Sequence, residues 1–147
     1  MVEFDLSAII GWSINVDSAT LEVYEKTVGD TGVSYGVYRI QESWEEDTVI
    51  WANRPSWGAS AFDVVTSDSS PGWWSFDVTA LVQQWIDETY PNYGFAITHP
   101  GGGCSPSLVN SSEYGITDPD QVPTLTIEYT VTDIEPTSWG SIKAEAE

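Results

Sequence analysis

Apolar and polar residues alternate along several short stretches of this chain, and that period of two constrains the fold more than any other feature. In residues 19–25 (ATLEVYE), Leu21 and Val23 alternate with more polar neighbours, and residues 124–132 (TLTIEYTVT) repeat the pattern. Because successive side chains of a strand point to opposite faces, each stretch predicts a strand with one buried face and one solvated face. Strands of this kind are typical of an antiparallel sandwich.

Further strands and one helix complete the predicted fold. Segments rich in Val, Ile, Thr, Tyr and Trp, separated by turn residues, predict strands at residues 34–41, 48–52, 73–78 and 94–98. In DVTALVQQWIDETY the period changes, because the apolar residues fall on one side of a helix and Thr79 is placed to cap its start. We therefore expect an all-β sandwich in which one short helix, at about residues 78–88, connects two strands.

The composition limits the classes of partner. The chain has 147 residues, enough for one domain with its own core, and 41% of them are hydrophobic. It carries 23 Asp and Glu against 4 Lys and Arg, a formal net charge of −19, which argues against nucleic acid or an anionic membrane as partner. The single Cys104 excludes an internal disulfide. No segment reaches membrane-spanning length and no signal peptide is recognisable at the start, so a secreted form would need its signal upstream.

The composition shifts after Thr132, which predicts a domain at residues 1–132 and a tail at residues 133–147. Residues 133–136 (DIEP) read as a linker, and apolar and charged residues alternate in the rest of the tail. The tail is therefore strand-like.

Several phrases spaced along the chain point to one family. They are EFDLS from Glu3, SATLEVY from Ser18, the spacing of Trp44 and Trp51 followed by NRP, FDVTALVQQWID, YGFAI, SSE and PTLTIEY. Together, over about residues 2–130, the chain resembles the DNRLRE domain, the disaggregatase-related repeat, which overlaps with carbohydrate-binding module family 96. The resemblance implies a jelly-roll-like antiparallel β-sandwich of secreted and cell-surface proteins, often attached to polysaccharide lyases and not itself catalytic.

The chain departs from that family at its start. Family members usually begin some tens of residues before the FDLS phrase, so the first strands of the sandwich are expected to be missing here, leaving unpaired backbone and apolar core. The tail is the candidate to fill the gap, either within its own chain or in a neighbouring copy by strand addition. Its candidate assembly residues are Trp139, Ile142, Ala144 and Ala146.

The stretch ESWEEDTVIWANRPSW, residues 42–57, supports two interpretations. Its tryptophans could stack on sugar rings while its acids and Arg54 bond sugar hydroxyls. Trp44 and Trp51, however, belong to the spacing of the family framework, so for these two we favour packing in the core. For Trp57, which follows Pro55 in a loop, core packing and ligand contact both stay open.

Adjacent Trp73 and Trp74 form the second aromatic candidate. In an extended strand they must point to opposite faces, so we expect one to be buried and the other exposed. The exposed tryptophan is a candidate for stacking on sugar, although exposed aromatics also occur without a ligand.

Catalysis and metal binding have weaker support. His99 is the only histidine and stands beside Pro100 without a serine or cysteine motif, so we expect no enzyme and no required cofactor. A structural calcium ion is possible, because calcium prefers oxygen ligands in loops. Its candidate ligands are Asp118, Asp120 and Asp68.

Two functions follow from these expectations. The first is a non-catalytic module, extracellular or at the cell surface, that binds polysaccharide. The alternative is a structural subunit of a surface layer or filament, in which copies of the chain join by donated strands. Glycan-dependent tryptophan fluorescence would favour the first, and an oligomer that resists denaturant would favour the second.

Overall fold

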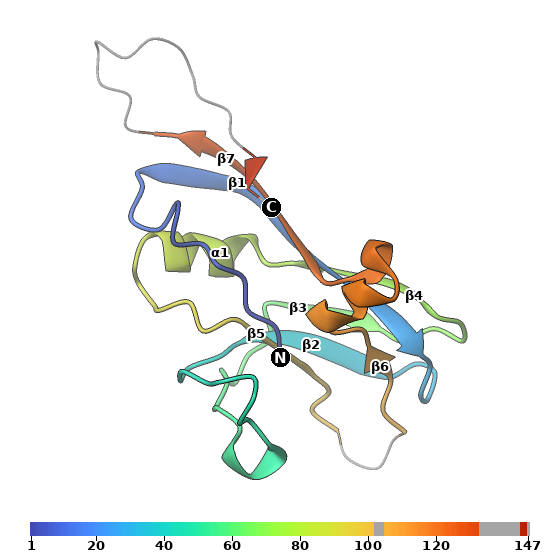
Figure 1. Ribbon diagram of the computed structural model, residues 1–147. Helices are drawn as coiled ribbons and strands as arrows, with labels where there is room; N and C mark the ends of the chain where they lie inside the picture. The colour runs from blue at the N-terminus through green and yellow to red at the C-terminus, as the bar shows by residue number, and fades with distance from the viewer. Residues whose placement is uncertain (102–104, 133–144, 147) are drawn as a thin grey trace.

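The computed structural model describes residues 1–101, 105–132 and 145–146, which form two antiparallel sheets (Figure 1). The larger sheet contains β4 (Gly72–Asp77), β1 (Ile14–Thr27), β7 (Thr124–Val131) and β8 (Glu145–Ala146) in that order, with β6 (Leu108–Val109) also paired to β1. The smaller sheet contains β3 (Asp63–Thr66), β2 (Ser34–Arg39) and β5 (Phe95–Thr98). The helices are α1 (Thr79–Ile86) and the short 3-10 turns η1 (Trp51–Asn53), η2 (Ser112–Ile116) and η3 (Pro119–Gln121). The predicted all-β sandwich with one short helix is confirmed.

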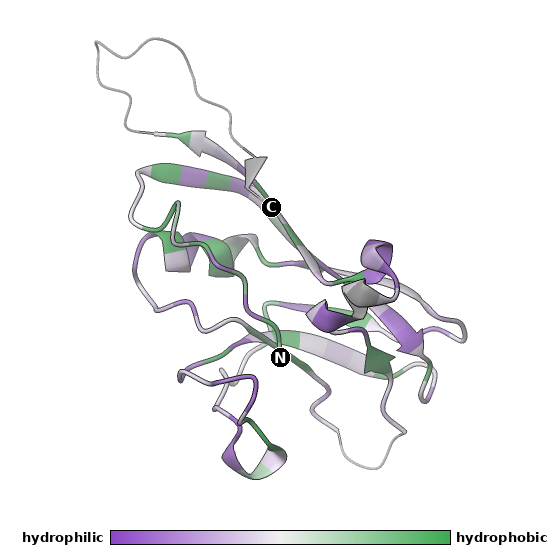
Figure 2. Cartoon of the chain, viewed as in Figure 1, coloured by the Kyte–Doolittle hydropathy of each residue, from purple (hydrophilic) through white to green (hydrophobic). Residues whose placement is uncertain are grey.

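The core lies between the two sheets. Apolar and polar residues alternate along β1, as Figure 2 shows by colour, and its inward residues Leu21 and Val23 are buried. They join one cluster with Val37 of β2, Phe95 of β5 and the apolar side of α1. Leu6 and Ile9, from the segment before β1, are also buried in this cluster. The N-terminal segment therefore covers part of the core.

Helix α1 packs against β1 and covers the part of the β1 edge that β4 does not pair with. The backbone N–H of Val16 donates to Oε1 of Gln83 at 2.7 Å, and Nε2 of Gln83 donates to the carbonyl of Ile14 at 3.1 Å. The N–H of Ala19 donates to the hydroxyl of Thr79 at 2.9 Å. Side chains of the helix thus take the place of a neighbouring strand, which leaves this edge of β1 without free backbone groups at these positions.

The capping residue of α1 differs from the predicted one. The helix begins at Thr79, and Val78 is its N-cap without a capping side chain. The Thr79 hydroxyl instead donates to Oδ1 of Asp77 at 2.7 Å while it accepts from Ala19. The periodicity predicted the helix correctly. The predicted cap is wrong, because the hydroxyl of Thr79 accepts a hydrogen bond from β1 and does not cap the helix.

Replacing Gln83 with alanine is expected to lower the free energy of unfolding by about 1–3 kcal/mol, because the Val16 N–H loses its partner in a part-buried position. Gln84→Ala is the matched control, since it makes the same change at the next residue of α1 and keeps the Gln83 bonds to β1. Urea unfolding followed by circular dichroism measures both. Equal losses for the two variants would contradict the role given to Gln83.

Two expectations concern the strands at residue 48 and in the tail. The predicted strand at residues 48–52 is wrong, because this stretch is a turn followed by η1. Of the tail, residues 145 and 146 form β8 and pair with β7 of the same chain, Ala146 opposite Ile127. Trp139, Ile142 and Ala144 lie outside the described residues, so the assembly role of the tail stays a prediction, as does the domain division at residue 132.

Candidate functional site

The loop between β2 and β3 carries the opening cluster of tryptophans and is held by its own side chains. Asn53 accepts a hydrogen bond from the N–H of Ile50 at 2.6 Å and donates from Nδ2 to the carbonyl of Thr48 at 2.9 Å. Glu42 accepts from the N–H of Ser56 at 2.8 Å and from its hydroxyl at 2.9 Å. These bonds fold residues 42–57 into a compact loop in place of a strand.

Two tryptophans anchor this loop and the third is presented to solvent. Trp44 and Trp57 are half-buried and pack against a small cluster of Tyr38, Ile40 and Ala96. Nε1 of Trp44 also donates to the carbonyl of Tyr93 at 2.8 Å. The core interpretation therefore holds for Trp44.

For Trp51 the core interpretation is wrong, because its side chain is 75% exposed. The physical reason is local: Trp51 starts the 3-10 turn η1, and none of the three residues of this turn is buried. The guanidinium of Arg54 stacks over the Trp51 ring at 3.6 Å from its centroid and lies 5.3 Å from the centroid of Trp57. Nη1 of Arg54 also donates to the Trp51 carbonyl at 2.6 Å. The loop thus holds an exposed aromatic ring in a fixed orientation.

A hollow of about 300 Å³ lies beside this ring and is called the tryptophan hollow here. Its walls come from the loop, the first residue and β5. They are Met1, Val49, Ile50, Trp51, Arg54, Trp57, Ala96, Ile97 and Thr98. Most of this surface is apolar, and Arg54 supplies the charge.

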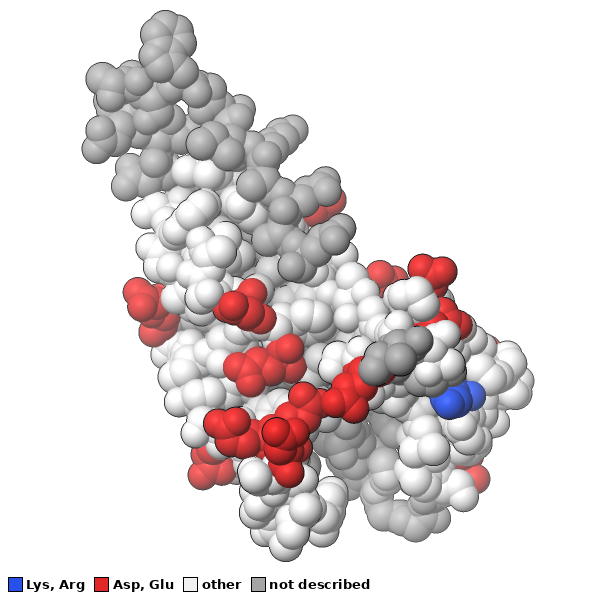
Figure 3. Space-filling model, viewed as in Figure 1, with Lys and Arg blue, Asp and Glu red and all other residues white. Residues whose placement is uncertain are grey.

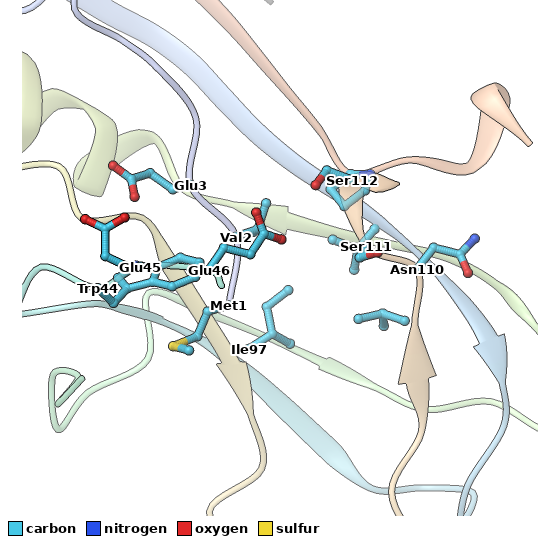
Figure 4. A pocket seen from close by; sticks show the side chains of 13 residues that line it. Met1, Val2, Glu3, Trp44, Glu45, Glu46, Ile97, Asn110, Ser111 and Ser112 are labelled. Carbon is cyan, nitrogen blue, oxygen red and sulfur yellow. The ribbon is translucent and has the colours of Figure 1, made fainter. Parts of the chain in front are cut away.

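A second hollow, of about 320 Å³, adjoins the first, because Met1 and Ile97 line both. We call it the carboxylate hollow (Figure 4). Its polar residues come from three separate segments and are Glu3, Glu45, Glu46, Asn110, Ser111 and Ser112. Its apolar lining includes Trp44, which directly precedes Glu45 and Glu46 in the sequence. The two hollows are neighbours that share Met1 and Ile97, and we call the pair the groove, with an aromatic end and an acidic end. Each is of the size of small-ligand sites.

The N-terminal segment that borders the carboxylate hollow is fixed to β5. Val2 and Phe95 exchange backbone hydrogen bonds of 2.9 and 2.7 Å, and Nδ2 of Asn92 donates to the Phe4 carbonyl at 2.8 Å. Gly94 has a φ of +85°, and a Cβ there would collide with the Val2 carbonyl. Glycine at this position therefore allows the segment to approach and to hold Glu3 at the rim of the groove.

All the charged side chains that line the carboxylate hollow are carboxylates. The carboxylates of Glu3 and Glu45 face each other in Figure 4, and partial burial, followed by repulsion from Glu45 and Asp5, raises the pKa of Glu3. Figure 3 shows carboxylates gathered in a band across this side of the molecule, with little Lys or Arg surface beside them. A solute that reaches the groove therefore meets a negative field.

Replacing Glu3 with glutamine is expected to raise the melting temperature slightly at neutral pH and to leave it unchanged well below pH 4. A raised carboxyl pKa means that ionisation of Glu3 destabilises the folded state. The protein therefore loses stability as the pH rises through the folded-state pKa of Glu3. Because Glu3 is largely exposed, screening keeps the effect small and added salt should reduce it further. Melting curves at both pH values measure the effect, and a lower melting temperature at neutral pH would contradict it.

Adjacent Trp73 and Trp74 point to opposite faces of the larger sheet, as predicted. Trp74 is buried at 6% exposure and packs on Tyr35, whereas Trp73 is 47% exposed on the outer face of the larger sheet. Trp74 therefore offers no surface to a ligand. Trp73 contacts the edge of Tyr24 at a centroid distance of 5.3 Å, and it lies on β4, a strand that contributes no residue to either hollow.

The candidate calcium ligands serve their own loops. Oδ1 of Asp118 accepts from the N–H of Asp120, and Oδ1 of Asp68 accepts from the N–H of Ser69 at 2.6 Å. Within residues 1–101, 105–132 and 145–146 there is no group of three or more His, Cys, Asp or Glu arranged to hold a metal ion. The calcium site stays a prediction.

The acids of residues 42–57 were candidates from the sequence, but the sequence did not indicate that Glu3 and residues 110–112 join Glu45 and Glu46 at the acidic end of the groove. Glu3, Asn110 and Ser112 are far apart along the chain and meet only because the N-terminal segment and the β6–η2 connection border the same hollow. No local sequence pattern predicts that residues so far apart in the chain line one hollow. The exposure of Trp51 did have a local signal, since the turn-forming residues Asn53 and Pro55 follow it.

One of three comparisons with known proteins identifies the family of this chain. Searches of curated proteins and of solved structures gave no match. Among the described residues, no helix has the length and apolar character needed to cross a membrane. Residues 1–128 match the profile of carbohydrate-binding module family 96, which confirms that part of the resemblance, while the link to the DNRLRE domain stays a prediction. The chain belongs to carbohydrate-binding module family 96.

Proposed function

We propose that this chain is a non-catalytic module, extracellular or at the cell surface, that binds polysaccharide in the groove between the loop at residues 42–57 and the β6–η2 connection. The observation that carries the proposal is the exposed ring of Trp51, held by Arg54 beside a hollow of about 300 Å³. Sugar rings present apolar faces that stack on such a ring, and their hydroxyls need polar partners at its side. Family membership supports the same class of ligand.

The polar end of the groove supplies those partners. Asn110, Ser111 and Ser112 can donate to and accept from hydroxyl groups, and Glu45 and Glu46 can accept from them. Because the two hollows adjoin at Met1 and Ile97, a bound chain of several sugars would contact both ends. This arrangement favours a polymer over a single sugar.

Affinity electrophoresis tests the proposal. Native gels that contain a neutral, an amino-bearing or a uronate-bearing polysaccharide are compared with a gel without polysaccharide. We expect retardation in at least one of them, with a change of tryptophan fluorescence on binding in solution. Reducing ends should not accumulate when the retained polysaccharide is incubated with the protein. Unretarded migration in all classes would overturn polysaccharide binding, and a steady release of reducing ends would overturn the non-catalytic role.

A further inference from the structure

A further hollow, of about 270 Å³, opens between the segment before β1 and the connection from α1 to β5 and is called the tyrosine hollow here. Its size is comparable with that of the two hollows of the groove. Its lining residues are Ile10, Trp85, Glu88, Tyr90, Pro91 and Asn92, and none of these six lines the groove. The fold therefore forms a second, separate concave surface beside α1.

The ring of Tyr90 is held in this hollow as the ring of Trp51 is held in the groove. Tyr90 is 39% exposed, and the guanidinium of Arg39 lies over its ring at 3.7 Å from the centroid. The corresponding distance from Arg54 to Trp51 is 3.6 Å. These are the two arginines of the chain, and each stacks over an exposed ring that lines a hollow. A ring with a cation on one face can offer its other face to a sugar.

Trp85 brings a hydrogen-bond donor without a partner to the same hollow. It is the one buried residue of the lining, so it forms the floor of the tyrosine hollow. Its Nε1 is buried and makes no hydrogen bond with the described residues. Native structures leave few buried donors unpaired, and each one costs stability until an acceptor reaches it. A ligand with hydroxyl oxygens supplies such an acceptor.

Glu88 adds a carboxylate to the lining from a strained position of the backbone. It follows Asp87, the C-cap of α1, and has a φ of +57°, a conformation that favours glycine at this position after a helix. Its exposed side chain lines the tyrosine hollow and can accept hydrogen bonds from hydroxyl groups. A carboxylate at a position where glycine would be less strained is a candidate for function.

We propose that the tyrosine hollow is a second sugar-binding site of this chain, which takes one ring of a polysaccharide on Tyr90. One hydroxyl of that sugar donates to Glu88, and another accepts from the Nε1–H of Trp85 once the exposed side chains at the rim have adjusted. The inference extends the proposed polysaccharide-binding function and rests on it for the class of ligand. With two separate sites, one module can hold together two polysaccharide chains or two stretches of one chain.

Nuclear magnetic resonance separates the two sites, because the indole N–H signals of Trp51 and Trp85 report on the groove and on the tyrosine hollow respectively. The two signals are assigned by their loss in Trp51→Ala and Trp85→Phe. The probe is the tetrasaccharide fraction from partial hydrolysis of the polysaccharide that native gels retain most strongly. We expect both signals to shift on titration, that of Trp85 downfield as it gains a hydrogen bond. Calorimetry should give two bound tetrasaccharides for each protein chain.

Variants at Tyr90 and Glu88 separate a built site from a change transmitted through the core. Tyr90→Ala should abolish the shift of the Trp85 signal and keep that of Trp51. Tyr90→Phe keeps the ring and should weaken binding in the tyrosine hollow by less than about threefold. Glu88→Gly should raise the melting temperature, because glycine adopts the φ of +57° without strain, and should still weaken binding there by at least about fivefold. A purely structural role of Glu88 would not give higher stability together with lower affinity.

An unmoved Trp85 signal beside a shifted Trp51 signal, one tetrasaccharide per chain, or a Trp85 shift that persists in Tyr90→Ala would overturn the inference and leave polysaccharide binding in the groove intact. Unmoved signals at both tryptophans, together with unretarded migration in every gel, would overturn the proposed function, and the inference with it.

Discussion

Replacing Trp85 with alanine is expected to lower the free energy of unfolding by about 3–5 kcal/mol, the largest effect on stability that we predict for a single side chain here. Trp85 lies on α1 and is 1% exposed. Its ring meets the edge of Phe95 at a centroid distance of 4.8 Å, so it joins the helix to the smaller sheet. Alanine would remove this contact and leave a cavity in the middle of the core.

Trp85→Phe separates the ring from its N–H group. Nε1 of Trp85 is buried without a hydrogen-bond partner among the described residues, and such a group costs about 1–3 kcal/mol of stability. Phenylalanine keeps the aromatic contact with Phe95 and removes this cost, so its loss should be less than half that of alanine. The exposed Trp12 provides the control, and Trp12→Ala should change stability by less than about 0.5 kcal/mol.

Urea unfolding followed by far-ultraviolet circular dichroism measures all three variants without relying on tryptophan fluorescence. A loss of less than about 1 kcal/mol in Trp85→Ala would contradict the position of this ring in the core. Losses of equal size in Trp85→Phe and Trp85→Ala would show that the N–H group has a partner.

The elements that the sequence predicted are those whose pattern is local. Along β1 and β7 the alternation of side chains fixes which face is buried, and along α1 the change to a helical period does the same. The opposite orientations of Trp73 and Trp74 follow from the same geometry of a strand. In each case the information lies within a few consecutive residues.

The elements that the sequence did not predict depend on contacts between distant segments. Gln83 replaces a strand at the edge of β1, and nothing in its neighbourhood along the chain indicates this use. Trp51 belongs to an aromatic spacing that suggested core packing, yet the side chain of Asn53 bonds the backbone of Thr48 and Ile50 and folds this stretch into a turn in place of a strand. The acidic end of the groove brings three segments of the chain together, so the set of residues that lines it could be found only from the fold.

Replacing Trp51 with alanine is expected to weaken binding of the most strongly retained polysaccharide by about 2 kcal/mol, a roughly thirtyfold loss. A single exposed ring can contribute this much because it offers a wide apolar face that is already held in place, here by Arg54 at 3.6 Å. The fold should not change, since the side chain is 75% exposed and contributes nothing to the core. An unchanged melting temperature checks this.

Trp73→Ala is the matched control, because it removes an exposed tryptophan from a strand outside both hollows and should change the affinity by less than about twofold. Trp51→Phe should recover part of the lost affinity, since a smaller ring can still stack on a sugar. Titration of each variant with the same polysaccharide, followed by calorimetry, gives the comparison. A larger loss in Trp73→Ala than in Trp51→Ala would move the binding site to the outer face of the larger sheet, where Tyr24 and Trp73 meet, and the groove would then lose its assigned function.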